Sequence, residues 1–288
     1  MTHYLREELA GLKTAARRAA ARRRRIKSGA WPPGARVAVN FTADFDAMLL
    51  RRLYNEPAMQ LAKGEFGGRV GIWRLLELFE AHAIPATIFT PGRICELYPA
   101  ALAAAARAGH ELADHMWEHR VPQQAELALD HVRKTAAALE RISGRRPVGS
   151  RSHYPPALLQ SEGFLYNSHG APSQHPHFVL HDDGTPCLLQ LPFHFAIDDA
   201  MFFSFAWYAS ANSEQRLVDP ERVLAMWFEA FLEHYRQGGY FNVCLHPFVS
   251  GRALRIAMLD RLIARMKSKP GVWFPTCEEL ARHVLAAA

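Results

Sequence analysis

Two aspartates follow the first long apolar run of the chain. Asp44 and Asp46 come after Val37–Phe41 and stand two positions apart. Residues two apart in an extended chain point to the same side, and parallel α/β folds keep their active sites at the carboxyl ends of their strands. The pair therefore indicates a general base or a metal ligand, although a lone Asp-x-Asp is also typical of a helix cap or a surface loop.

A pair of histidines lies further along the chain. His115 and His119 are four positions apart, so on a helical turn both imidazoles would project from one face. With one carboxylate they would supply the three protein ligands typical of a catalytic Zn²⁺ and leave a position for water; alone, such a pair is common on helix surfaces. His110-Glu111 begins like the zinc-protease motif His-Glu-x-x-His, but the next histidine comes five positions later, which excludes that geometry.

A third histidine follows a second apolar run. The run Asn242–Leu245 delivers His246, and Pro247 ends the strand because proline cannot continue a ladder of hydrogen bonds. His246 could be a further ligand, a general acid or a capped surface residue. Since imidazole changes charge near pH 7, it is well suited to protonating a leaving nitrogen.

Other polar and aromatic residues are weaker candidates for substrate contact. A loop over residues 65–69 could contact substrate or only connect elements. Arg151 and Tyr154, which follow an expected strand at Val148–Ser150, could bind an anion or line a cleft. Asp198 and Asp199 could orient His246 or remain solvated. The candidate substrate-binding residues are Glu65, Gly68, Trp117, Arg151, Tyr154, Asp198 and Asp199. The histidines between residues 169 and 181 are interpreted as incidental to a loop, and the aromatic run 202–208 as core or subunit interface.

Short apolar runs alternate with amphipathic patterns after residue 36. The strands expected are Val37–Phe41, Ala86–Phe89, Glu111–Ala113, Val148–Ser150, Leu188–Leu191, Tyr240–Leu245 and Val272–Phe274. The helices expected are Val70–Ala81, Pro99–Ala108, Gln124–Ile142, Glu221–Gln237, Ala253–Met266 and Glu278–Leu285. This alternation predicts a parallel sheet with helices outside it, as an open doubly wound sheet or a (β/α) barrel. The first strand is followed by neither glycine-rich nucleotide-binding motif, which counts against a nucleotide fold.

The charge of the chain is concentrated in its first thirty residues. The net charge is +6, and residues 1–30 contribute nine basic and two acidic side chains, so the remainder carries 25 basic against 26 acidic. We interpret residues 1–30 as a basic helical arm, because it lacks the aromatic residues that stack on bases and the large apolar face that anchors a helix in a membrane. Nucleic-acid and membrane partners are therefore not expected.

The four cysteines bear on the compartment. They are scattered and form no Cys-x-x-Cys pair, which is typical of buried thiols in a reducing environment. The N-terminus has positive charge without a continuous apolar segment, which counts against a secretory signal. We expect a cytoplasmic protein.

Three motifs in order resemble those of one enzyme family. Asp44-Phe-Asp46, His115-x-x-x-His119 and Leu245-His246-Pro247 are similar to successive motifs of the polysaccharide deacetylase (NodB-homology) family, over about residues 36–285. Three further segments resemble a branch that contains bacterial peptidoglycan-deacetylase-like proteins, deacetylase-like allantoinases and cyclic imide hydrolases. These segments are Glu65–Arg74, Gly109–Glu111 and His246–Arg252.

The resemblance implies a fold, a metal and a set of roles. It implies a distorted (β/α) barrel of seven or eight parallel strands as one catalytic domain over residues 31–288. It implies one divalent ion, usually Zn²⁺, on Asp46, His115 and His119, with Asp44 as base and His246 as acid. An oxyanion donor would lie near Tyr154. One departure is Arg151-Ser152-His153-Tyr154, with histidine where the family has proline. Members of the branch tend to be homotetramers, so we expect a homo-oligomer, a tetramer or a dimer.

The chemistry that follows is hydrolysis of a non-peptide amide bond. The leading hypothesis is removal of an acyl group from an N-acylated sugar or small molecule by metal-activated water. Ring opening of a cyclic amide or imide is an alternative that the motifs cannot separate. A non-catalytic binding protein on the same barrel is a third, and the joint presence of Asp44, Asp46, His115, His119 and His246 argues against it.

Overall fold

Strand β2 (Val37–Asp44) is the centre of the fold. The computed structural model describes residues 17, 23–25, 30–53, 55–56, 58–170, 173–203 and 218–287 of the 288. Every residue of β2 is buried, which explains why its sequence is mostly apolar and why its polar residues Asn40 and Thr42 make buried hydrogen bonds. On one side β2 pairs with β9 (Tyr240–Leu245) and on the other with β3 (Thr87–Thr90), both in parallel.

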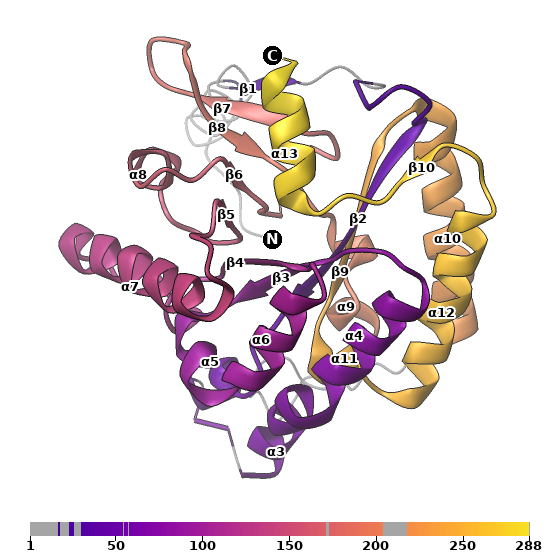
Figure 1. Ribbon diagram of the computed structural model, residues 1–288, viewed down its shortest axis with the longest axis horizontal. Helices are drawn as coiled ribbons and strands as arrows, with labels where there is room; N and C mark the ends of the chain where they lie inside the picture. Colours follow the sequence, from indigo (N-terminus) through magenta and orange to yellow (C-terminus); the bar gives the residue numbers. More distant parts are fainter. Residues whose placement is uncertain are drawn as a thin grey trace, which may run out of the picture.

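The sheet extends from β2 through parallel neighbours and curls (Figure 1). From β3 it continues to β4, β5, β6 and β8, all parallel, and then to β7 and β1, which are antiparallel. Short strand β10 pairs with the start of β2. The remaining bounds are β1 (Arg23–Arg25), β4 (Glu111–Asp114), β5 (Gly149–Ser150), β6 (Tyr166–Asn167), β7 (His177–Leu180), β8 (Pro186–Gln190) and β10 (Val272–Trp273). The expected barrel of parallel strands is confirmed, as a curled and incompletely closed sheet.

The curled sheet has a seam between β8 and β9. Within the described residues these two strands are not paired with each other. The seam is spanned by a bridge between Asp198, which follows β8, and Cys244 of β9, and the backbone N–H of Asp199 donates to the Cys244 carbonyl at 3.1 Å. Two segments far apart in sequence are thereby joined beside the end of β9.

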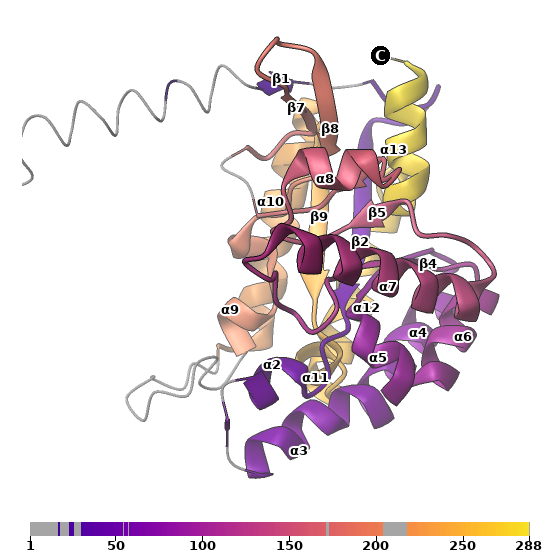
Figure 2. The same cartoon turned by 90° about the vertical axis from the view of Figure 1, so that its left-hand side faces the viewer.

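Helices pack on the outside of the sheet and at its two ends. Long apolar faces from α4, α6, α10 and α12 form one core with the outer side of β2 and β9, as their 3.6-residue periodicity predicts. Helix α13 lies at one end of the molecule and α3 at the other in both views (Figure 2). The helices are α2 (Leu49–Leu53), α3 (Ala58–Phe66), α4 (Ile72–Ala81), α5 (Gly92–Leu97), α6 (Pro99–Arg107), α7 (Ala125–Ser143), α8 (Pro156–Ser161), α9 (Ala200–Phe203), α10 (Pro220–Gln237), α11 (Pro247–Ser250), α12 (Ala253–Lys267) and α13 (Cys277–Ala286).

The long elements agree with the sequence predictions to within a few residues, whereas two predicted loops are wrong. Residues 65–69 complete α3 and enter a π-helical turn, Gly67–Gly71. A Cβ on Gly71 would lie 2.0 Å from the carbonyl oxygen of Pro247, and one on Gly68 would lie 2.3 Å from the ring of Tyr98. The glycines therefore mark close helix packing rather than flexibility. In the histidine-rich stretch, His177–Leu180 forms strand β7.

The N-terminal arm lies mostly outside the described residues. The helical prediction is wrong at Arg23–Arg25, which forms β1 and pairs antiparallel with β7, where the edge of the sheet presents unpaired backbone groups. Of the aromatic run, Phe202 and Phe203 pack in the core, and residues 205–208 are outside the described part. No described helix is long and apolar enough to cross a bilayer.

Candidate active site

The carboxyl ends of β2, β4 and β9 place three motifs at one rim. Asp44 ends β2, His115 follows β4, and His246 follows β9. Parallel pairing in register brings these ends together, with Ala43 opposite Leu245. The rim that the sequence indicated as the location of the chemistry is therefore the place where these side chains meet.

Asp46, His115 and His119 form a cluster whose ligand atoms face one another. Asp46 Oδ1 lies 3.4 Å from His115 Nε2 and 3.7 Å from His119 Nε2, and the three donor atoms lie within 4.8 Å of one another. Asp46 is 1% exposed, yet neither of its oxygens, nor His115 Nε2, has a hydrogen-bond partner in the described part of the chain. Buried lone pairs without donors are costly, so this arrangement fits a bound cation.

The histidines are held in the form that binds metals. His115 Nδ1 contacts the Arg151 carbonyl oxygen; since a carbonyl only accepts, Nδ1 carries the proton and the Nε2 lone pair faces the cluster. Burial lowers the pKa of His115 to about 4, and burial likewise lowers that of His119 to about 4. Burial raises the pKa of Asp46. One carboxylate and two neutral imidazoles match the donor set of Zn²⁺.

A tight turn, not the helical turn that we expected, brings the two histidines together. Residues 116–119 are a turn, with Met116 at φ 67° and His119 at φ 59°. Trp117 supports it from below: its ring packs where a Cβ on Gly92 would be, and Lys134 Nζ lies 4.0 Å from the ring centroid. Trp117 is 5% exposed and is engaged by Gly92, Arg93 and Lys134, so its contact with substrate stays a prediction.

Asp44 is held by Arg151. Arg151 Nη1 donates to Asp44 Oδ1 at 2.5 Å, and the other oxygen lies 3.8 Å from His115 Nε2 and 3.9 Å from His246 Nε2. Burial alone would raise the pKa of Asp44, but the charges of Arg151, His115 and His246 lower it below its ordinary value. Asp44 is therefore a buried carboxylate kept ionised between two imidazoles.

The position of Arg151 differs from the expected one. It is 3% exposed and lies between the rings of Phe89 and Phe193, 4.1 and 4.6 Å from their centroids. Its Nη2 donates to Thr42 Oγ1 and Ser168 Oγ, both at 2.9 Å, and its Nε donates to the Ser168 carbonyl oxygen at 3.1 Å. With every edge engaged, Arg151 is a support for Asp44 and not an exposed anion-binding group. No sequence pattern indicated its partners.

Asp199 fixes His246 at two points. Asp199 Oδ2 accepts from the backbone N–H of His246 at 2.8 Å, and Oδ1 accepts from Nδ1 at 2.7 Å. Burial would lower the pKa of His246, but Asp199, Asp198 and Asp44 raise it to about 10. Asp198 instead accepts from the backbone N–H of Ala200, and burial raises its pKa to about 6. Of the two aspartates, Asp199 therefore orients and charges the imidazole.

The remaining candidates lie apart from the cluster. Glu65 accepts from Tyr98 Oη and Arg69, and Gly68 packs on Tyr98, so both belong to the packing of the π-helical turn. Tyr154 is 2% exposed, packs in a core with Met116, and also lines a cavity beyond the ends of β5, β6 and β8, as expected of a residue that could line a cleft. Its hydroxyl has no hydrogen-bond partner in the described region.

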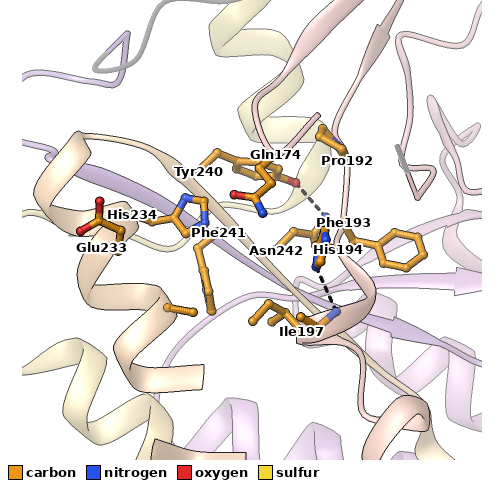
Figure 3. A pocket seen from close by; sticks show the side chains of 12 residues that line it. Gln174, Pro192, Phe193, His194, Ile197, Glu233, His234, Tyr240, Phe241 and Asn242 are labelled. Carbon is orange, nitrogen blue, oxygen red and sulfur yellow. Dashed lines mark hydrogen bonds between the residues drawn. The ribbon is translucent and has the colours of Figure 1, made fainter. Parts of the chain in front are cut away.

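A cavity of about 260 Å³ lies beside the first half of β9 (Figure 3). Tyr240, Phe241 and Asn242 form one wall, and Glu233 and His234 of α10 form another. His246 comes after the opposite end of the strand, and none of the candidate catalytic or ligand residues lines the cavity. It is a space at the seam and not the reaction centre.

Comparisons with known proteins agree with the motifs. A family model described as polysaccharide deacetylase matches residues 66–167. The peptidoglycan deacetylase of Helicobacter pylori is 27% identical over 266 residues, covering 78% of this chain and 87% of that protein. A solved structure of a putative polysaccharide deacetylase from Mycobacterium smegmatis is 30% identical, with a TM-score of 0.82 over 91% of this chain and 95% of that one. The Puue allantoinase has the same fold, with a TM-score of 0.78 at 24% identity over 91% and 94% of the two chains.

Proposed function

Because this chain belongs to the polysaccharide deacetylase family, we propose that it is a metal-dependent hydrolase that removes the acyl group from an N-acylated sugar or a related small molecule. The observation that carries the proposal is the cluster of Asp46, His115 and His119, whose inward-facing buried atoms lack partners. A carboxylate and a cationic imidazole on either side of it supply the base and the acid that amide hydrolysis requires.

Asp44 and His246 each carry out one of the two proton transfers. When bound, a divalent ion at this cluster would supply a Lewis acid for the amide carbonyl and lower the pKa of water. Asp44, kept ionised by Arg151, accepts the proton of the attacking water. His246, kept cationic by Asp199, donates its Nε2 proton to the departing nitrogen. Water and amide are thereby converted into a carboxylate and an amine.

The protonation states support Asp44 as the base and His246 as the acid, rather than the reverse. Asp44 Oδ2 lies about as far from His246 Nε2 as from the metal-cluster atom His115 Nε2, at 3.9 and 3.8 Å. A carboxyl group whose pKa is lowered, as in Asp44, is ionised at neutral pH and accepts a proton, whereas an imidazole whose pKa is raised to about 10, as in His246, is protonated and donates one. The two therefore start in the protonation states that the forward reaction uses.

Three finer points belong to the proposal. The nitrogen and oxygen donor set supports Zn²⁺ as the ion, and the resemblance to the branch of small-molecule hydrolases supports a homotetramer or dimer. The four free, buried cysteines support a cytoplasmic location. We place the catalytic domain at residues 31–288 and treat residues 1–30 as an arm. Elemental analysis of the purified protein and light scattering after gel filtration test the ion and the assembly.

A substrate panel tests the proposed function directly. The purified protein, with its metal content measured, is assayed for acid release from N-acetylglucosamine, its oligomers and 4-nitroacetanilide, and for ring opening of allantoin and of a cyclic imide. We expect acetate release that chelation abolishes and added Zn²⁺ restores. Ring opening without acetate release would replace the acyl-removing function, and full activity in a metal-free protein would refute the metal site.

A further inference from the structure

A second cavity opens at the same rim as the metal cluster. Its volume is about 390 Å³, and it lies past the ends of β5, β6 and β8, which are parallel to β4 and end at the same side. Ser152, His153, Asn167, His169 and Gln190 provide most of its polar lining. None of these five is a proposed metal ligand, base or acid.

The cavity is joined to the reaction centre through neighbouring residues in the chain. Ser152 follows Arg151, whose carbonyl oxygen accepts from His115. His169 follows Ser168, whose hydroxyl accepts from the guanidinium that holds Asp44. At two places, therefore, a residue that lines the cavity directly follows in the chain a residue that helps to hold the ligand His115 or the base Asp44.

Part of the lining is already engaged in hydrogen bonds. The Asn167 amide clamps the main chain of Ser152, accepting from its N–H and donating to its carbonyl, both at 3.1 Å. The Ser152 hydroxyl is 2.7 Å from that of Ser150. His153 and His169 are bonded to each other, Nδ1 to Nε2 at 2.8 Å, which leaves a second nitrogen on each ring. These residues form a rigid wall.

Gln190 differs from the rest of the lining. Its residue is 6% exposed, and its side-chain amide has no hydrogen-bond partner among the described residues. An amide offers two donors and an acceptor oxygen, and in Gln190 these atoms are open to the cavity. The side chain lines the cavity, so a group that both donates and accepts would satisfy it.

The charge of the lining limits what that group can be. No aspartate, glutamate, lysine or arginine lines the cavity in the described part of the chain. A charged group would lose its hydration without gaining a countercharge, which is strongly unfavourable. An uncharged group with donors and acceptors, such as a carboxamide or a pair of hydroxyls, has no such penalty.

We propose that this cavity is a specificity pocket in which Gln190 and the His153–His169 pair bind an uncharged hydrogen-bonding group of the substrate while the scissile amide lies at the metal cluster. This inference rests on the proposed function, because it assumes that one molecule reaches both places. It goes further in naming what the substrate carries beside its acyl group, and in assigning His153, which replaces the proline of related motifs, to recognition.

Three matched substrates test the pocket. They are β-glycosides of N-acetylglucosamine whose aglycones are glycolamide, glycerol or 2-aminoethanol, so that they present a carboxamide, two hydroxyls or an ammonium group. With the metal-loaded protein we expect KM for the ammonium compound to be about tenfold higher than for the better of the two neutral compounds, and kcat to vary less. That better compound tells which neutral group the pocket prefers. Equal KM values for all three would overturn the proposal.

Two substitutions at one position separate recognition from folding. Gln190→Glu should reverse the preference, because the new carboxylate pairs with the ammonium group. Gln190→Met keeps the size of the side chain and removes its polar atoms, and should raise KM for the neutral compounds about tenfold. Gln160→Glu is the control: it adds the same charge on the exposed face of α8 and keeps an acceptor for His181. Unaltered KM ratios in both Gln190 variants would refute the assignment.

Failure of the pocket and failure of the enzyme remain distinguishable. If no glycoside releases acetate, the proposed function is wrong for these substrates, and the same three compounds are then titrated calorimetrically into wild type and Gln190→Met. Weaker binding of the neutral compounds to the variant would support the pocket on its own. Equal or undetectable binding to both proteins would overturn it.

Discussion

Replacing Asp199 by asparagine should move the alkaline limit of activity to lower pH. Asp199 accepts two hydrogen bonds from His246, at 2.7 and 2.8 Å, and its charge raises the pKa of that imidazole against the opposing effect of burial, to about 10. Asparagine removes the charge and can offer only one accepting oxygen. The imidazole then loses its proton more easily, so the general acid is lost at a lower pH.

The size of the shift follows from the bonds that are lost. A hydrogen bond to a charged group contributes about 1.5–3 kcal/mol, and one pKa unit corresponds to about 1.4 kcal/mol. The pKa of His246 should therefore fall by about one to two units. The alkaline limb of kcat/KM should move by the same amount, since that profile reports the acid of the free enzyme.

The assay is a pH profile of kcat/KM from pH 6 to 11 on the metal-loaded protein. The acidic limb should stay in place, because Asp44 is held separately by Arg151. Asp130→Asn, an exposed change on α7, is the matched control and should leave both limbs where they are. An unmoved alkaline limb in Asp199→Asn, with metal content intact, would show that His246 is not the acid or that Asp199 does not set its charge.

Three other perturbations probe the metal cluster, the helix packing and the base of the sheet. His115→Ala should lower bound metal from about one equivalent to near zero in elemental analysis, while circular dichroism stays native; retained metal would contradict the cluster. Gly71→Ala places a Cβ 2.0 Å from the Pro247 carbonyl and should destabilise the protein by about 1–3 kcal/mol in urea unfolding; no loss would mean that the contact relaxes freely. Burial raises the pKa of Glu111 to about 7 from its ordinary 4.5, so the unfolded chain loses this proton first and stability should fall as pH rises from 4.5 to 7. Glu111→Gln should flatten that part of the melting-temperature profile, and an equally steep profile would assign the dependence to other groups.

The sequence was sufficient for the strands that carry the motifs. β2 and β9 are mostly apolar, with Asn40, Thr42 and Asn242 as exceptions, and the polar residues that reach the rim, Asp44 and His246, come at their carboxyl ends. Burial on both faces imposes this pattern, so both position and direction could be inferred. The same pattern predicted that Asp44 and His246 lie at strand ends, whereas the grouping of His115 with them followed from the family resemblance.

What sequence reasoning missed depends on contacts between distant residues. Arg151 meets Asp44 across 107 positions, and no local pattern records that approach. His119 has a left-handed φ, so the helical spacing predicted the pairing of His115 and His119 correctly but not the tight turn that produces it. The glycines at residues 67–71 indicate mobility when considered singly, and close packing only when α11 is placed beside them.

The seam between β8 and β9 affects the order in which the folding chain gains metal binding and activity. Asp44 and the three residues of the metal cluster lie on or just after β2 and β4, which are joined through β3. His246 follows β9 and Asp199 follows β8, so these two residues meet only across the seam. A folding chain could thus assemble its ligand cluster while still lacking a proton donor. Activity would then appear only when the seam closes. During refolding, metal binding should appear before activity, and the delay between the two measures how long the seam takes to close.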